Sequence, residues 1–236
     1  MPDHDNVPAG VRVASGPTIL MGDGAYFDFN APEQCAITIE DVAYGLAYTA
    51  RFRGQTRRMT SDGRRVFYSV AEHCVRMAQQ LEDDGYNHKM RTFALMHELG
   101  EVPLGDLPSP AKWKLPEFKA LEKRCEAAIW ATFGLPPMSP DAAALIKSYD
   151  LRMLATEKRD LMTGAIPGDR WEMLDGCVPF EDMTVTPYSH PDVAADAFLL
   201  EWRRLTQPAH SADCASFRIA SPGPCDCGYP AGGVNG

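Results

Sequence analysis

The chain has 236 residues, a mass of 26.0 kDa and a mean hydropathy of -0.26, and 45% of its residues are apolar. These values are typical of globular proteins and exclude fibrous, low-complexity and largely disordered chains. The 23 basic and 32 acidic residues give a formal charge of -9, so bulk charge does not equip the chain to hold nucleic acid. Any anionic ligand is therefore expected at a local basic patch.

Neither a membrane span nor secretion is expected from the sequence. No run of about 18 apolar residues occurs, and the first ten residues, MPDHDNVPAG, lack the charged and apolar stretches of a signal segment. The cysteine count is seven, and four of these residues lie far apart inside regular segments: Cys35, Cys74, Cys125 and Cys177. The sequence thus predicts a cytoplasmic protein with reduced thiols.

The first 36 residues are predicted to form an N-terminal extension with a small hairpin. Residues 18–21 and 26–29 are its extended arms, and they flank a glycine-rich turn. Helical spacing begins at Thr38, which has the form of a capping box with Asp41, and that helix is expected to end near residue 50.

Two more helices are predicted after a polar segment over 51–65. The first, over 68–82, has five apolar residues on one face: Val70, Cys74, Met77, Ala78 and Leu81. The second, over 88–102, has a buried face that starts with Met90, Phe93 and Ala94.

The rest of the chain is predicted as a loop, three helices and a tail. The loop covers 103–116, and the helices cover 118–133, 139–162 and 192–205. Residues 163–187 show no clear periodicity. The fold class is therefore all-α, with a single domain over 37–206 and a flexible tail rich in Cys, Gly and Pro over 207–236.

Ionisable residues occupy predicted core positions on two helices. The buried face over 88–102 continues onto His97, Glu98 and Glu101, and Asp150 lies on the apolar stripe of another helix. Burying two carboxylates on one helical turn is costly unless a cation compensates. His73 alone is more typical of a hydrogen-bonded core histidine, but with the other residues it completes a ligand set of two nitrogens and two oxygens.

The predicted ligands are His73, His97, Glu98 and Asp150, and this mixed set suits Mn, Co, Zn, Fe or Ni better than calcium. A zinc protease is not expected. The helical zinc motif of that class needs a second histidine four residues after the first, and position 101 is a glutamate.

The order and spacing of several motifs resemble the HD-domain metal-dependent phosphohydrolases, particularly bacterial 5′-deoxynucleotidases and phage deoxynucleoside triphosphohydrolases. The resemblance covers about residues 26–163. The matching pieces are Arg51-Phe52, Tyr68-Ser-Val-Ala-Glu-His73, His97-Glu98 with Glu101, Gly105-Asp-Leu-Pro-Ser-Pro-Ala-Lys112, and Lys147-Ser-Tyr-Asp150-Leu. The resemblance implies a helical bundle that holds one divalent ion with the four predicted ligands.

The resemblance also implies roles for five further residues. Glu101 matches the position that orients or deprotonates the attacking water, and Asp106 matches a second acid near the scissile phosphate. Arg51 and Lys112 match residues near the substrate phosphate. Phe52 takes the place of an aromatic residue that packs against the deoxyribose. A carboxylate beside a divalent ion is suited to accept a proton from water.

One position departs from the family signature, which has His-Asp where this chain has His97-Glu98. Glutamate carries its carboxylate one methylene farther out, which can shift the ion or weaken its binding. A regulatory protein that binds a nucleotide or a metal without turnover is therefore an alternative. The third hypothesis is a structural interaction protein, for which no bound metal is expected.

The segment 51–65 supplies a local basic patch, with six arginines against one acid. Arg51 lies close enough in sequence to the helix of His73 to reach a phosphate beside the metal, where a guanidinium binds through two hydrogen bonds. Arg57 and Arg58 are expected in a solvated loop, and 60–65 resembles an insertion.

These observations predict metal-dependent hydrolysis of phosphate from small nucleotides, with 2′-deoxynucleoside 5′-phosphates as the favoured class. Mono- and triphosphates such as dATP, and guanosine tetraphosphate alarmones, are rival substrates. The expected partners are a small-molecule nucleotide and further copies of the chain in a homo-oligomer, and neither a nucleic acid polymer nor a membrane is expected. The tail holds a second metal candidate whose spacing fits no common zinc pattern: His210, Cys214, Cys225 and Cys227.

Overall fold

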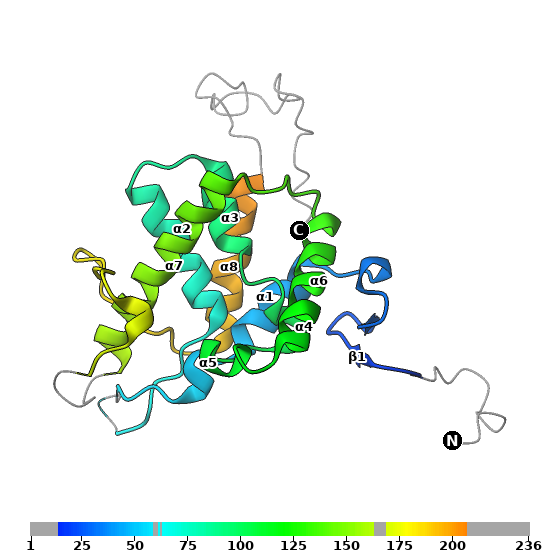
Figure 1. The fold of residues 1–236 in the computed structure, drawn as a ribbon, viewed down its shortest axis with the longest axis horizontal. Coiled ribbons are helices and arrows are strands. Elements are labelled where there is room, and N and C mark those ends of the chain that lie inside the picture. The colour runs from blue at the N-terminus through cyan, green and yellow to red at the C-terminus, as the bar shows by residue number, and fades with distance from the viewer. Residues whose placement is uncertain (1–13, 59–60, 62, 163–168, 207–236) are drawn as a thin grey trace, which may run out of the picture.

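The computed structural model describes residues 14–58, 61, 63–162 and 169–206. Within these ranges the protein is helical apart from one two-stranded hairpin near the N-terminus (Figure 1), which confirms the predicted all-α class. None of the helices in these ranges has both the length and the apolar character needed to cross a membrane. The predicted tail and its cysteine and histidine candidates lie outside the described residues.

The N-terminal hairpin pairs β1 (Thr18–Leu20) with β2 (Tyr26–Asp28) in an antiparallel register that sets Ile19 opposite Phe27. The Phe27 side chain is fully buried in the main hydrophobic core, so the hairpin is packed against the helices. The predicted hairpin is thus confirmed. A short 3-10 turn, η2 (Pro32–Gln34), leads from it towards the first helix.

Four helices form the centre of the bundle: α1 (Ile39–Tyr48), α2 (Val70–Asp83), α3 (His88–Met96) and α8 (Pro191–Thr206). Helix α2 packs against α3 and α8, and α1 packs against α8. Helices α1 and α2 both begin with complete capping boxes, in which the side chains of Thr38 and Ser69 accept a backbone hydrogen bond three residues later. Figure 1 shows α1 and α8 beside each other although they stand at opposite ends of the sequence.

Two long helices complete the bundle. Helix α6 (Pro116–Thr132) ends before Gly134, which has a φ of +61°, and α7 (Pro140–Leu161) starts with Ser139 as its N-cap. Both match the predicted helices. Helix α7 packs against α2, α3 and the short turn η4 (Glu172–Leu174). The region after α7 that showed no periodicity thus returns to that helix.

The predicted continuous helix over 88–102 is wrong, because the chain turns between residues 97 and 100. Helix α3 ends at Met96, and a separate short helix, α4 (Glu101–Leu104), follows. The physical reason is Pro103, which has no N–H to donate to Leu99 in a continuous helix. In α4 the proline falls in the first turn, where that N–H is not needed. The predicted loop over 103–116 also contains the short helix α5 (Ser109–Lys112).

The segment between α1 and α2 begins with a tight turn, η3 (Arg51–Gly54). Phe52 and Arg53 have φ values of +54° and +53°, and both therefore adopt the left-handed conformation that non-glycine residues seldom occupy. Such strained residues gather at functional sites. A backbone bridge between Ala50 and Ser69 closes the base of the segment. Arg51 is thereby held beside the first turn of α2.

The four internal cysteines are free thiols in the structure. Cys74 and Cys125 are buried, and Cys35 and Cys177 are half-buried.

Candidate metal centre

The four predicted metal ligands come together in one cluster. His73 lies on α2, His97 caps the end of α3, Glu98 follows in the turn, and Asp150 lies in the middle of α7. One ligand atom from each of the four residues lies within 4.8 Å of the other three. Residues up to 77 positions apart are thus brought to a site that could hold a metal ion.

The two histidines of the cluster are oriented by hydrogen bonds on their far nitrogens. His73 Nδ1 lies 2.6 Å from Glu157 Oε1, and His97 Nδ1 lies 2.6 Å from the carbonyl oxygen of Ala94. Since both acceptors require an N–H, each Nδ1 is assigned the proton. The two Nε2 atoms then face each other at 3.2 Å. Histidines that bind metals through Nε2 typically donate their other ring N–H to a carboxylate or a carbonyl oxygen in this way.

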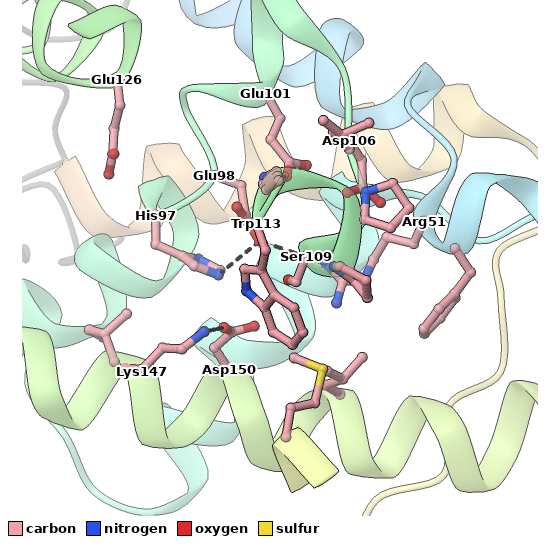
Figure 2. A pocket seen from close by; sticks show the side chains of 18 of the residues that line it. Arg51, His97, Glu98, Glu101, Asp106, Ser109, Trp113, Glu126, Lys147 and Asp150 are labelled. Atoms are coloured by element: carbon pink, nitrogen blue, oxygen red, sulfur yellow. Dashed lines mark hydrogen bonds and ion pairs between the residues drawn. The ribbon is translucent and has the colours of Figure 1, made fainter. Parts of the chain in front are cut away.

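The carboxylates of Asp150 and Glu98 complete the cluster. Asp150 Oδ1 lies 3.4 Å from His73 Nε2, and Glu98 Oε1 lies 3.5 Å from His97 Nε2. The longer glutamate side chain therefore still brings its carboxylate into the cluster. Asp150 is also held by Lys147, whose Nζ lies 2.7 Å from Oδ2 (Figure 2).

Burial and neighbouring charges shift the pKa values of His73, His97 and Glu98. Burial disfavours the His73 cation, but the carboxylates of Glu157 and Asp150 outweigh burial and raise the pKa of His73 to about 9. Burial and the neighbouring His73 charge lower the pKa of His97 to about 4. Burial and the Asp150 charge raise the pKa of Glu98 to about 7. The cluster therefore favours a cation at its centre.

Glu157 connects the histidine cluster to the substrate arginine predicted from the resemblance. Its Oε1 accepts from His73 and, at 3.0 Å, from the hydroxyl of Tyr68. Its Oε2 accepts from Arg51 Nε at 3.1 Å and from Nη2 at 3.0 Å. Glu157 is fully buried, and Arg51 directs its remaining nitrogen, Nη1, towards Glu98 at 3.7 Å. The Glu157 carboxylate thus orients both His73 and Arg51.

Glu101 stands at the start of α4 with its side chain almost fully buried. Lys112 Nζ lies 3.0 Å from Glu101 Oε1 and 2.6 Å from Glu122 Oε1, so the lysine joins α5 to α4 and α6. The second oxygen of Glu101, Oε2, is buried without a hydrogen-bond partner in the described part of the chain. Burial and the nearby charges of Glu98 and Asp106 raise the pKa of Glu101 well above its usual range.

A pocket of about 860 Å³ opens over the cluster. Eight of the nine residues predicted from the sequence line it: Arg51, Phe52, His97, Glu98, Glu101, Asp106, Lys112 and Asp150. The ninth, His73, is fully buried behind the other ligands. Figure 2 shows the labelled carboxylates and His97 directed into this space, with the indole of Trp113 beside them.

Two features of the site were not predicted from the sequence. Glu157 was not among the predicted site residues, although its position seven residues after Asp150 places both on one face of α7. That spacing was the available signal. Trp171 and Met173 come from a segment without periodicity, and no sequence pattern indicated that they line the pocket.

Comparison with known proteins gives relatives whose names assign no activity. The chain is 33% identical over 184 residues to the protein named uncharacterized protein YfdR of Escherichia coli (strain K12), across 78% of this chain and 93% of that protein. It is 37% identical over 123 residues to uncharacterized protein RCAP_rcc00048 of Rhodobacter capsulatus, across 51% of this chain and 60% of that protein. No protein-family model matches the chain.

Proposed function

This chain belongs to the same family as the Escherichia coli protein YfdR, and we propose that it is an HD-type phosphohydrolase that removes phosphate from small nucleotides. 2′-Deoxynucleoside 5′-phosphates are the favoured substrates. The observation that carries the proposal is the convergence of four ligand atoms from His73, His97, Glu98 and Asp150 beneath a large pocket. Such a site suits metal-assisted hydrolysis.

The donor set fits a divalent transition metal. Imidazole nitrogens and carboxylate oxygens suit Mn, Co, Zn, Fe or Ni, and the two anchored Nδ1 atoms leave both Nε2 atoms for the ion. When bound, a divalent ion supplies a Lewis acid that polarises a phosphoryl oxygen and makes water easier to deprotonate.

Glu101 is suited to act as the general base. Lys112 holds one of its oxygens, and the other is buried without a partner among the described residues, which leaves it available to accept a proton from water. A raised pKa makes a carboxylate a stronger base, and a cation at the neighbouring cluster would oppose part of that rise.

The remaining predicted residues have distinguishable roles. Arg51 keeps Nη1 free of Glu157, so this nitrogen is the one that can contact a phosphate. Lys112 is engaged by Glu101 and Glu122, and we therefore assign it to the positioning of Glu101. Asp106 lines the pocket, where its carboxyl group can deliver a proton to the leaving oxygen.

The proposal is tested by product release from metal-depleted protein reloaded with Mn, Co, Zn, Fe or Ni. The substrates are deoxynucleoside mono- and triphosphates, their ribose counterparts and guanosine tetraphosphate, and the released phosphate, pyrophosphate and triphosphate are measured separately. We expect metal-dependent release that Glu101→Gln lowers by about 100-fold to 10,000-fold. Glu126→Gln, which alters another carboxylate of the same pocket, should retain activity. Absence of metal-dependent release from every substrate would contradict the proposal.

Glu98→Asp separates the hydrolase from a regulatory protein that binds without turnover. The variant restores the His-Asp pair of the HD signature, so a hydrolase should keep or gain activity. If the wild type and Glu98→Asp both bind metal and nucleotide but release no phosphate, the regulatory alternative is favoured.

A further inference from the structure

The pocket above the metal centre divides into two unlike halves along α7. Five of its lining residues lie on one face of that helix: Ala143, Ile146, Lys147, Asp150 and Leu154. Asp150 is the metal ligand among them, and Leu154 lies one helical turn beyond it, about 6 Å along the helix axis. The pocket therefore continues past the metal centre towards the C-terminal half of α7.

The half near the start of α7 is rich in charge. Lys112, Lys123, Glu126 and Lys147 all line it, and they come from α5, α6 and α7. Lys112 and Lys147 are paired with carboxylates of the site. A ligand that lies in this half contacts these charged groups together with the apolar side chains of Met138, Ala143 and Ile146.

The half beyond Asp150 is apolar and aromatic. Phe52, Leu154, Trp171 and Met173 line it, and Glu172 is the charged residue of this half within the described part of the chain. The Phe52 and Trp171 rings lie 6.3 Å apart between centroids. The Arg51 guanidinium lies 5.7 Å from the Phe52 ring and also faces Glu98, so this apolar half borders the metal centre directly.

The aromatic rings of this half are held in place. Phe52 packs against the small hydrophobic cluster of Tyr68, Leu161 and Val185. Lys158 Nζ lies 4.9 Å from the Trp171 ring centroid, and the same ammonium donates to the carbonyl oxygen of Asp169 at 2.7 Å. The half-buried Trp171 ring is thus fixed from α7 before any ligand arrives, which limits the entropy lost on binding.

We propose that the apolar half formed by Phe52, Leu154, Trp171 and Met173 is a subsite for the aromatic base of a nucleotide, with Trp171 as its stacking platform. The inference rests on the proposed function, because the phosphate of that nucleotide lies at the metal centre. A base on Trp171 and a phosphate beside Asp150 leave the sugar next to Phe52. This placement puts the apolar end of the ligand on apolar walls and its anionic end beside Arg51.

Trp113 is the competing platform in the pocket. Its side chain is 68% exposed, and within the described ranges it stacks on no other ring or cation. A base stacked there would have to immobilise an indole that the protein leaves free. Trp171 is therefore the better-prepared surface.

The test is equilibrium binding of the four deoxynucleoside 5′-monophosphates and of 2-deoxyribose 5-phosphate to metal-loaded protein in which every form, the wild type included, carries Glu101→Gln so that the ligands are not hydrolysed. Loss of one base–aromatic stack is expected to weaken binding of the nucleotides between about 5-fold and 150-fold in Trp171→Ala. Trp171→Phe should bind nearly as the wild type does. Affinity for 2-deoxyribose 5-phosphate, which lacks the base, should stay unchanged in both variants.

Tyr44→Ala and Trp113→Ala are the control variants, and phosphate release is a separate readout. Tyr44→Ala removes an exposed aromatic residue from α1, and it should alter no affinity. The subsite is refuted if Trp171→Ala binds nucleotides as the wild type does, or if Trp113→Ala alone lowers their affinity. It is also refuted if Trp171→Ala loses affinity for 2-deoxyribose 5-phosphate as much as for the nucleotides. Because binding is measured in the Glu101→Gln background, a Trp171-dependent affinity together with an unsubstituted protein that releases no phosphate supports the subsite and refutes the hydrolase. An undiminished kcat/KM of Trp171→Ala for deoxynucleotides would support the hydrolase and refute the subsite.

Discussion

Glu157 forms hydrogen bonds with both His73 and Arg51. Its carboxylate accepts hydrogen bonds from His73, Tyr68 and Arg51, and it is completely buried. A buried carboxylate is stable only with full compensation, which these three donors provide. Because Glu157 fixes the Nδ1 side of His73, the Nε2 side points to the cluster. We infer that Glu157 is a positioning residue for metal binding.

Glu157→Gln should weaken metal binding about 10-fold to 100-fold, which is the usual cost of losing a partner of a ligand histidine. The amide keeps the shape of the side chain but loses the charge that supports His73 and Arg51. Affinity is measured by competition with a chelator, and circular dichroism records whether the variant is folded. Tyr68→Phe removes one hydrogen bond and no charge, so its effect should be smaller. A folded Glu157→Gln protein with wild-type metal affinity would refute the role.

The raised pKa of His73 predicts that metal binding releases a proton. At about 9 this pKa lies above neutral pH, so His73 is protonated at pH 7 in the metal-free protein. Metal coordination needs an unprotonated Nε2. Metal affinity should therefore rise about tenfold per pH unit until the pH reaches about 9. Below pH 7 the dependence of metal affinity on pH should be steeper, because the pKa of Glu98 is about 7.

The proton is counted by titration calorimetry at pH 7 in buffers of different ionisation enthalpy. We expect about one proton from His73 and a fraction from Glu98. His190→Ala, which removes a histidine remote from the cluster, should leave that count unchanged. Binding without proton release would mean that His73 is already neutral in the metal-free protein.

The break between α3 and α4 is the place where apolar periodicity predicted a continuous helix and the structure has a turn. Apolar spacing correctly predicted the main helices, because each has one face against the core, and α1, α2 and α7 also have a capped N-terminus. The same spacing also continued across His97 to Glu101, where the chain in fact turns. Pro103 was the local signal for that turn. Its effect depends on where the next helix, α4, starts, and α4 packs against both α1 and α6.

Gly100 shows how closely that turn approaches α6. A β-carbon at this position would lie 2.8 Å from Glu122 Cγ and 2.9 Å from the Glu122 carbonyl oxygen. Gly100→Ala should therefore push α4 away from α6 and destabilise the protein by about 1 to 3 kcal/mol. Urea unfolding measures the loss. The movement should also lower any phosphohydrolase activity, since Glu101 is the next residue.

Gly45→Ala is the matched control for this substitution. Its added β-carbon would meet Val102 Cγ1 at 3.1 Å, which is a side-chain atom that can move, and alanine is favoured within α1. We expect little loss of stability from Gly45→Ala. Equal unfolding midpoints for Gly100→Ala and the wild type would show that the contact with α6 can relax.

The assembly of the site from distant segments explains which parts the sequence could reveal. The order and spacing of short motifs predicted the four ligands and their neighbours, because each motif keeps its own local geometry. No local pattern relates Glu157 to Arg51 or Trp171 to Phe52, since those contacts arise only when α7 and the segment after it pack beside η3. Tertiary packing therefore supplied the hydrogen bonds of Glu157 and the aromatic half of the pocket.

Because the ligands come from α2, α7 and the turn after α3, a bound metal ion should stabilise the packing of these elements against one another. An ion that binds only the folded chain contributes about 2.7 kcal/mol when its free concentration is 100 times its Kd. For a protein of this size that corresponds to a rise in Tm of about 5 to 11 °C. The rise is measured by calorimetry on metal-depleted protein before and after addition of Mn, Co, Zn, Fe or Ni. His97→Ala lacks one ligand and should lose most of the metal-induced rise, whatever its own Tm. An equal rise in the wild type and the variant would place the stabilising ion elsewhere in the protein.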